Sequence, residues 1–144
     1  CKTFMTQRSD FDRKWYVLDV KDQILGRAST RIANLLMGKG KPIYSHSTDC
    51  GDFVVAVNAS KIKITGNKGE QKISFHHTSH PGGGRSVLFK KLLAEKPERA
   101  LYLSVKRMLP KNKLASRQIV RLKIYRQPTH PHAAQQAEKI EVAN

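Results

Sequence analysis

The sequence has few cysteines, few acidic residues and no long hydrophobic run. Two cysteines, Cys1 and Cys50, are too few for a disulfide framework, so we expect free thiols in a reducing compartment. No stretch approaches the roughly 18 apolar residues that a membrane span needs. No basic-then-apolar signal is visible at the amino terminus. We therefore expect a cytoplasmic protein that neither enters a membrane nor is secreted.

Catalytic and cofactor motifs are missing as well. The sequence contains no GxxxxGK[ST] phosphate loop, no GxGxxG after the first expected strand, and no HExxH, CxxC or GxSxG. Asp49 and Asp52 flank Cys50-Gly51 and resemble a carboxylate pair, but Asp and Gly equally suit a turn that begins a strand. We predict no enzymatic activity, no cofactor and no small-molecule substrate.

Positive charge, in contrast, is abundant. Lys and Arg number 27 against 11 Asp and Glu, which gives a formal charge of +16. Thirteen basic residues lie between Arg85 and Arg126, where the only acids are Glu95 and Glu98. Self-repulsion opposes a compact state with this excess, and a nucleic acid is the commonest polymer that neutralises it. The composition therefore favours a nucleic-acid-binding protein.

The hydrophobic pattern predicts one α/β domain over residues 1–144. The apolar runs at 15–20 and 53–57 are typical of buried strands, and a helical pattern from Gly26 to Gly38 lies between them. Strand, helix and strand in this order predict a parallel βαβ unit. Residues 1–14 are expected to form an extended arm.

The remaining segments are expected to add a hairpin and further helices. Alternating residues at 61–65 and 71–76 predict the hairpin. Ser86 is the expected cap of one helix, and Pro97 lies in the first turn of the next. A third helix and a final strand near Ile124 follow. The tail, residues 127–144, is expected to run over the surface.

A histidine cluster stands beside a glycine-rich loop. His76, His77 and His80 could serve as zinc ligands, stack on RNA bases or be ordinary surface residues. Neighbouring residues of a strand point to opposite faces, which argues against His76 and His77 sharing a metal. We predict no metal site and favour RNA contact. The loop before Arg85 either lets an RNA backbone approach closely or is simply flexible.

The densest basic segment is 106–113, between two expected helices. Cations at a helix carboxyl end stabilise its dipole by about 0.3–1 kcal/mol each, which explains one or two of them but not the cluster. We therefore predict RNA contact here. Lys39 and Lys41 are equally compatible with RNA contact and with a solvated surface.

A series of short motifs covers residues 15–136. They are Trp15-Tyr16-Val17-Leu18-Asp19, Leu25-Gly26-Arg27, Gly38-Lys39-Gly40-Lys41, Asp49-Cys50-Gly51-Asp52, Asn58-Ala59, Thr65-Gly66-Asn67-Lys68, His76-His77-Thr78, Pro81-Gly82-Gly83, Lys96-Pro97-Glu98-Arg99, Met108-Leu109-Pro110-Lys111, and His130-Pro131-His132-Ala133-Ala134-Gln135-Gln136. In these motifs and in their order, the sequence resembles the bacterial type of large-subunit ribosomal protein thirteen.

The resemblance implies a three-layer α/β fold around a mainly parallel sheet, and contact with large-subunit rRNA and neighbouring ribosomal proteins. It also implies early entry into subunit assembly, without catalysis, in a cytoplasmic or organellar ribosome. Arg107 replaces a usual Gly, Ala115-Ser116 a common Gly-Arg, and Ala137 a common Pro. The expected RNA contacts are Lys39, Lys41, Lys68, His76, His77, His80, Arg85, Lys106, Arg107, Lys111, Lys113, Arg117 and Arg121.

Two other functions compete with this hypothesis. A small nucleotide-dependent enzyme with a basic surface would need a phosphate loop and a catalytic set, and the sequence offers neither. A free regulator of messenger RNA would use the same basic surface, so only its location off the ribosome would distinguish it.

Overall fold

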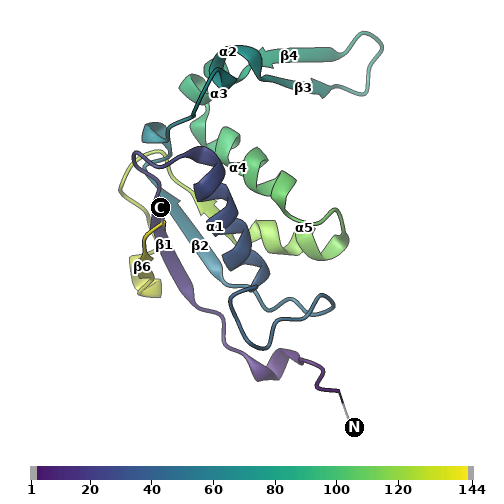
Figure 1. The fold of residues 1–144 in the computed structure, drawn as a ribbon, viewed down its shortest axis with the longest axis vertical. Helices are drawn as coiled ribbons and strands as arrows, with labels where there is room; N and C mark the ends of the chain where they lie inside the picture. The colour runs from purple at the N-terminus through teal and green to yellow at the C-terminus, as the bar shows by residue number, and fades with distance from the viewer. Residues whose placement is uncertain (1–2, 143–144) are drawn as a thin grey trace.

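A four-stranded parallel sheet forms the centre of the protein (Figure 1). The computed structural model describes residues 3–142. The sheet consists of β1 (Trp15–Asp19), β2 (Phe53–Val57), β5 (Leu122–Ile124) and β6 (Glu138–Ile140). Its strands are ordered β5-β2-β1-β6 and every pairing is parallel. The predicted α/β class with a mainly parallel sheet is confirmed.

The predicted βαβ unit is formed by β1, α1 (Leu25–Met37) and β2. Leu18 and Val54 are fully buried, as expected for apolar runs covered on both faces. The helix ends at Gly38, whose φ of 77° lies in the left-handed region. Its backbone N–H donates to the carbonyls at the end of the helix, which is a common helix stop. The predicted end at Gly38 is therefore confirmed.

Three further helices follow the hairpin: α3 (Phe89–Glu95), α4 (Pro97–Met108) and α5 (Lys113–Val120). One face of the sheet packs against α1, α4 and α5 in a single hydrophobic core. Leu101 and Val105 of α4 are fully buried there. Pro97 occupies the first turn of α4, as predicted.

The opposite face of the sheet is covered by the carboxyl-terminal segment. Val17, Val55 and Val57 pack there against Trp15, Tyr125 and Ala137, the last of which belongs to the tail. The tail contains the short turn η3 (Ala133–Gln135) and the edge strand β6. The third layer of the expected fold is thus a tail rather than helices.

The expectation of a merely superficial tail needs correction. Residues 138–140 pair with β1, and Val142 is only 7% exposed. Glu138 and Lys139 are exposed on this short edge strand. Because its residues are mostly polar, the strand lacks the apolar pattern by which β1 and β2 are recognised.

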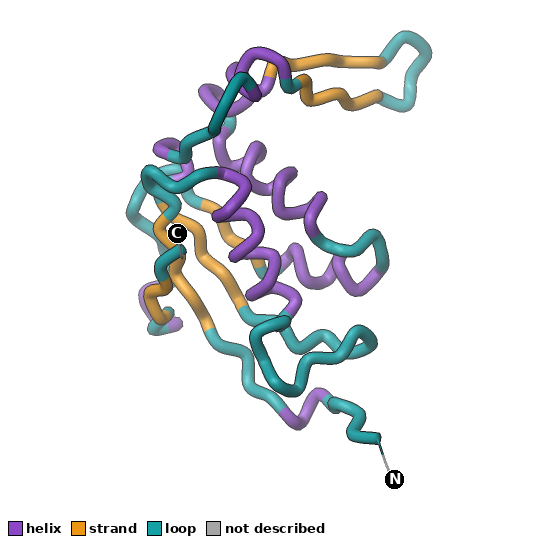
Figure 2. The backbone as a smooth tube through the Cα atoms, in the orientation of Figure 1, coloured by secondary structure: helices purple, strands orange, loops and turns teal. Residues whose placement is uncertain are grey.

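The predicted hairpin exists, but one of its strands is different. β3 (Ile73–His77) pairs antiparallel with β4 (Gly84–Leu88), not with residues 61–65. Lys63 instead pairs with Ile24 ahead of α1. The hairpin projects from the body of the protein, as Figure 2 shows. The loop between its strands is closed by hydrogen bonds from the Thr78 N–H to the Gly83 carbonyl and from the Gly83 N–H to the His80 carbonyl.

Short elements flank residues 61–65, the segment expected to pair with β3. η2 (Ala59–Lys61) and α2 (Lys68–Gln71) lead into β3. Ser86 lies in β4, so the prediction that it caps a helix is wrong. The helix begins at Phe89 instead, directly after Leu88. Both misassignments involve alternating or polar residues that suit a strand and a loop equally well.

The amino-terminal arm lies against the loop that follows α1. The Thr6 hydroxyl donates to the Ile43 carbonyl at 2.6 Å, and the Lys14 N–H donates to Asp52 at 3.0 Å. The arm includes the turn η1 (Arg8–Asp10). Cys50 is a buried free thiol, as predicted, whereas Cys1 lies outside the described residues.

Candidate nucleic-acid interface

The basic segment between α4 and α5 forms an exposed corner. Lys106 and Arg107 lie in the last turn of α4, and Lys111 and Lys113 follow on the loop and at the start of α5. All four are exposed. Asn112 fixes the start of α5, because its side chain accepts a hydrogen bond from the Ala115 N–H at 2.8 Å. The cations therefore project from a rigid turn, as predicted.

A second group of cations connects this corner to the hairpin. The pKa of Lys72 is lowered from 10.5 by burial first and then by the charges of Arg107 and Lys68. Lys68, Lys72 and Met108 also line one cavity of about 160 Å³. Lys68 and Lys72, at the two ends of α2, thus share a cavity with Met108 at the end of α4, and the charge of Arg107 acts on Lys72. Sequence reasoning missed Lys72, whose proximity to Arg107 depends on the tertiary fold.

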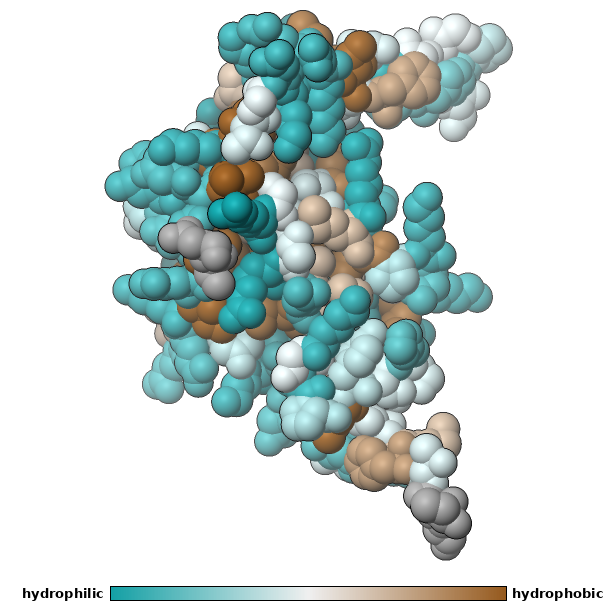
Figure 3. Space-filling view, in the orientation of Figure 1, coloured by the Kyte–Doolittle hydropathy of each residue, from teal (hydrophilic) through white to brown (hydrophobic). Residues whose placement is uncertain are grey.

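The top of the molecule is strongly hydrophilic. Figure 3 shows hydrophilic side chains gathered over α2 and α3 on the visible face. Lys68, Lys90 and Lys91 of these helices are exposed. This part of the surface adjoins the base of the hairpin in Figure 1. The positive charge thus extends from α2 and α3 onto the projecting strands.

The hairpin brings two of the predicted residues together. His76 is the cross-strand partner of Arg85, so their side chains share a face. His77 is opposite Gly84 and points to the other face. His80 lies in the exposed loop. Within residues 3–142, no group of three or more His, Cys, Asp or Glu side chains is arranged to hold a metal ion.

The other face of the hairpin carries exposed apolar side chains. Ile73, Phe75 and Leu88 are 56%, 60% and 50% exposed. Ile73 and Leu88 are cross-strand partners, and Phe75 follows on the same face. Gly84 makes room for the Phe75 ring, since a Cβ there would lie 3.2 Å from it. This platform was not predicted, because an alternating strand normally buries its apolar face.

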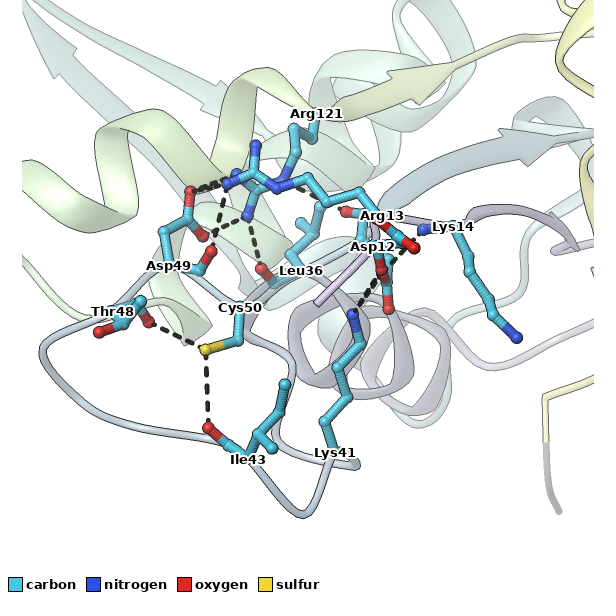
Figure 4. A network of polar contacts seen from close by, with 11 residues as sticks. Asp12, Arg13, Lys14, Leu36, Lys41, Ile43, Thr48, Asp49, Cys50 and Arg121 are labelled. Atoms are coloured by element: carbon cyan, nitrogen blue, oxygen red, sulfur yellow. Dashed lines mark hydrogen bonds and ion pairs between the residues drawn. The ribbon is translucent and has the colours of Figure 1, made fainter. Parts of the chain in front are cut away.

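Two predicted contact residues have their charges satisfied inside the protein (Figure 4). Arg121 is only 5% exposed, and its guanidinium binds both carboxylate oxygens of Asp49. It also donates to the carbonyls of Leu36 and Asp52. Lys41 binds Asp52 at 2.7 Å. The expectation that Arg121 is an RNA contact is therefore not supported, because its charge belongs to a buried network.

This network also settles the role of the two aspartates. Asp49 is bound by Arg121 and by Arg13, and Asp52 by Lys41 and the Lys14 N–H. These contacts fasten the loop before β2 to the amino-terminal arm. Asp49 and Asp52 thus act as structural ion pairs, not as a catalytic pair.

The other predicted cations lie on the surface. Lys39 and Lys68 are exposed near the ends of α1 and α2, and Arg117 is exposed on α5. Arg117 and Arg121 are one helical turn apart, yet only Arg121 turns inward.

No helix within residues 3–142 has the length and apolar character needed to cross a membrane.

The parallel sheet and the outward-facing cations define a small, strongly basic α/β protein. A family model described as "Ribosomal protein L13" matches residues 13–131. The chain therefore belongs to the ribosomal protein L13 family, a structural, non-enzymatic family of the large ribosomal subunit. This membership confirms the resemblance drawn from the motifs and the prediction that the chain is not an enzyme.

Curated relatives agree over nearly the whole chain. The chain is 51% identical over 140 residues to the large ribosomal subunit protein uL13 of Roseiflexus castenholzii, covering 97% of this chain and 96% of the relative. It is 48% identical over 141 residues to uL13 of Thermotoga maritima, covering 98% and 95%. It is also 48% identical over 141 residues to uL13 of Caldanaerobacter subterraneus, covering 98% and 99%.

Proposed function

We propose that this chain binds large-subunit rRNA directly as a structural constituent of the large ribosomal subunit and supports early subunit assembly. The observation that carries the proposal is the exposed cluster of Lys106, Arg107, Lys111 and Lys113, with Lys68 and Lys72 at a cavity that Met108, at the end of α4, also lines. Membership in a family of large-subunit ribosomal proteins supports rRNA as the acidic polymer that this surface would meet.

Repulsion among these cations favours an anionic partner. Burial and the charges of Arg107 and Lys68 lower the pKa of Lys72, so its ammonium form is less favoured than that of an isolated lysine. A phosphate placed near Lys68, Lys72 and Arg107 would offset the repulsion among their charges and raise the pKa of Lys72. The Arg107 guanidinium also suits phosphate, because it can donate two parallel hydrogen bonds.

The hairpin supplies a different kind of contact. His76 and Arg85 present polar donors on one face, whereas Phe75 presents an aromatic ring on the other. RNA recognition combines such phosphate contacts with stacking of unpaired bases on aromatic rings. A projecting hairpin can therefore enter folded RNA and use both faces.

The proposed contact surface omits Arg121 and Lys41, whose charges are paired internally.

Neighbouring large-subunit proteins are proposed as further partners. The proposed location is the ribosome of the cytoplasm, with an organellar ribosome as the alternative. The proposed RNA contacts are Lys39, Lys68, Lys72, His76, His77, His80, Arg85, Lys106, Arg107, Lys111, Lys113 and Arg117.

Sedimentation tests the proposed location. A tagged full chain should follow the large subunit through a sucrose gradient, before and after the subunits are dissociated at low magnesium, and should resist a moderate salt wash. Protein that remains at the top of both gradients would refute the ribosomal assignment.

Salt-dependent binding tests the rRNA contact. The affinity of the full chain for large-subunit rRNA is measured from low to high salt for the wild type, for Lys72→Gln with Arg107→Gln, and for Lys139→Gln. Each lost phosphate contact should reduce the slope of log affinity against log salt by about 1. Lys139 lies on β6 and provides the control, since its substitution removes one positive charge from a different edge of the protein, against two in the double variant. Equal slopes for all three proteins would contradict the proposed surface.

A further inference from the structure

A groove of about 710 Å³ opens where α4 meets α5. Leu109, Ala115 and Ile119 form its buried apolar floor. Tyr102 of α4 lines it, and Val120, which is 65% exposed, stands at its rim. Its volume lies within the roughly 300–1,000 Å³ of sites that hold small organic groups.

Positive charge surrounds this apolar floor. Lys106, Lys111 and Lys113 line the groove, and no acidic residue among residues 3–142 does. A second groove of about 520 Å³ continues past Tyr102 and Lys106, which line both, and contains Arg99 and Glu98. The groove therefore combines an apolar floor with three cations at its edge.

We infer that this groove holds an unpaired nucleotide of RNA, with the base against Tyr102 and the apolar floor and the phosphates on Lys106, Lys111 and Lys113. The inference rests on the proposed rRNA binding and specifies how one part of that surface acts. A paired duplex hides its base faces and would leave the apolar floor empty. An unpaired nucleotide brings the flat aromatic face of its base and a phosphate to the same place.

Continuity with the rest of the basic surface favours RNA over an acidic peptide. Lys106 at the groove is followed in α4 by Arg107 and Met108, and Met108 lines a cavity together with Lys68 and Lys72. A strand of RNA carries a charge at each nucleotide and can follow these cations from the groove toward the hairpin. A short acidic peptide would neutralise the groove alone.

Fluorescence gives a direct readout of the base. The full chain is mixed with a ten-nucleotide single-stranded RNA that contains one 2-aminopurine, and with the same strand in a duplex. We expect quenching of 2-aminopurine and tighter binding for the single strand, because only an unpaired base can stack in the groove. Anisotropy of an end label reports binding independently of stacking.

Three substitutions separate stacking from charge. Tyr102→Leu should weaken single-strand binding on the order of 10-fold and remove the quenching while leaving the salt slope unchanged. Lys111→Gln should reduce the slope by about 0.7, the value for one phosphate contact of a single strand. Val120→Glu places a negative charge at an exposed rim, so it should weaken binding without disturbing the core. Lys139→Gln serves as the charge-matched control.

The outcomes distinguish the inference from the proposed function. Equal affinity for single strand and duplex, unchanged by Tyr102→Leu and Val120→Glu, would overturn the nucleotide groove and leave general rRNA binding intact. Absence of binding to any RNA, including large-subunit rRNA, would overturn both. A Glu-rich peptide that binds with the same dependence on Tyr102 and Val120, while the RNA shows no quenching, would overturn the nucleotide in favour of a peptide. Thermal unfolding of each variant verifies that the fold is retained.

Discussion

Arg121 binds Asp49 through both carboxylate oxygens, although the two residues are 72 positions apart in the sequence. Arg121 follows α5 and is only 6% exposed in its side chain, whereas Asp49 lies in the loop before β2. The same guanidinium donates to the carbonyl of Leu36 near the end of α1 at 2.9 Å. One side chain thus joins the end of α5 to the loop before β2 and to the end of α1.

Removing this guanidinium should destabilise the protein strongly. Arg121→Met leaves the Asp49 carboxylate and two carbonyls without their main donor, so we expect a loss of about 3–5 kcal/mol in the free energy of unfolding. The remaining contact of Arg13 with Asp49 favours the lower end of this range. Urea denaturation measures the change. Arg117→Met, at an exposed position of the same helix, should change it by less than about 0.5 kcal/mol.

Gly51 allows the loop to pass against α1. A Cβ at this position would lie 1.6 Å from the Leu36 carbonyl oxygen, which is backbone and cannot move aside cheaply. Gly51→Ala should therefore destabilise the protein by about 1–3 kcal/mol or more, as overpacking does. Gly40→Ala is the matched control, because nothing lies within 4 Å of a Cβ there. Similar melting temperatures for the two variants would contradict the proposed close approach.

The sequence specifies the elements whose local pattern is strong. The apolar runs of β1 and β2 predict buried strands, and Gly38 marks the end of α1. β6 escapes detection because two of its three residues are charged and it forms one edge of the sheet. The partner of β3 is misassigned because residues 61–65 and β4 offer equally plausible strand patterns, and only tertiary contacts place Lys63 beside Ile24.

The candidate site is predictable in its location but not in its details. Clustered cations predict the corner at 106–113, since charge is visible in the sequence. Arg121 belongs to the wider basic region 85–126, and nothing local shows that it turns inward to Asp49. Lys72 lies outside that region and joins the site only because it lines one cavity with Met108 at the end of α4. Exposure and pairing are properties of the fold, so charge patterns alone cannot supply them.

The ionisation of Lys72 should respond to its neighbours. Arg107→Gln removes one of the charges that lower the pKa of Lys72, so this pKa should rise but stay below 10.5, because burial remains the largest cause. Saturating rRNA should raise it as well. The pKa of Lys72 is lower in the folded protein than in the unfolded chain, so between the folded pKa and 10.5 the unfolded state binds more protons. In that pH range the titration of Lys72 therefore makes the free energy of unfolding rise with pH. Carbon-13 NMR of the Lys72 side chain follows the titration; a pKa unchanged by Arg107→Gln would contradict the proximity.

Phe75 should matter for RNA binding and not for folding. Its ring is 60% exposed on the hairpin, so Phe75→Ser removes little buried area and should change the free energy of unfolding by less than about 0.5 kcal/mol. If an rRNA base stacks on this ring, the same substitution should lower the affinity for large-subunit rRNA on the order of 10-fold with an unchanged salt slope. Met5→Ser, at a side chain 74% exposed on the amino-terminal arm, is the matched apolar control. Equal rRNA affinities for the two variants would contradict the stacking of a base on the Phe75 ring.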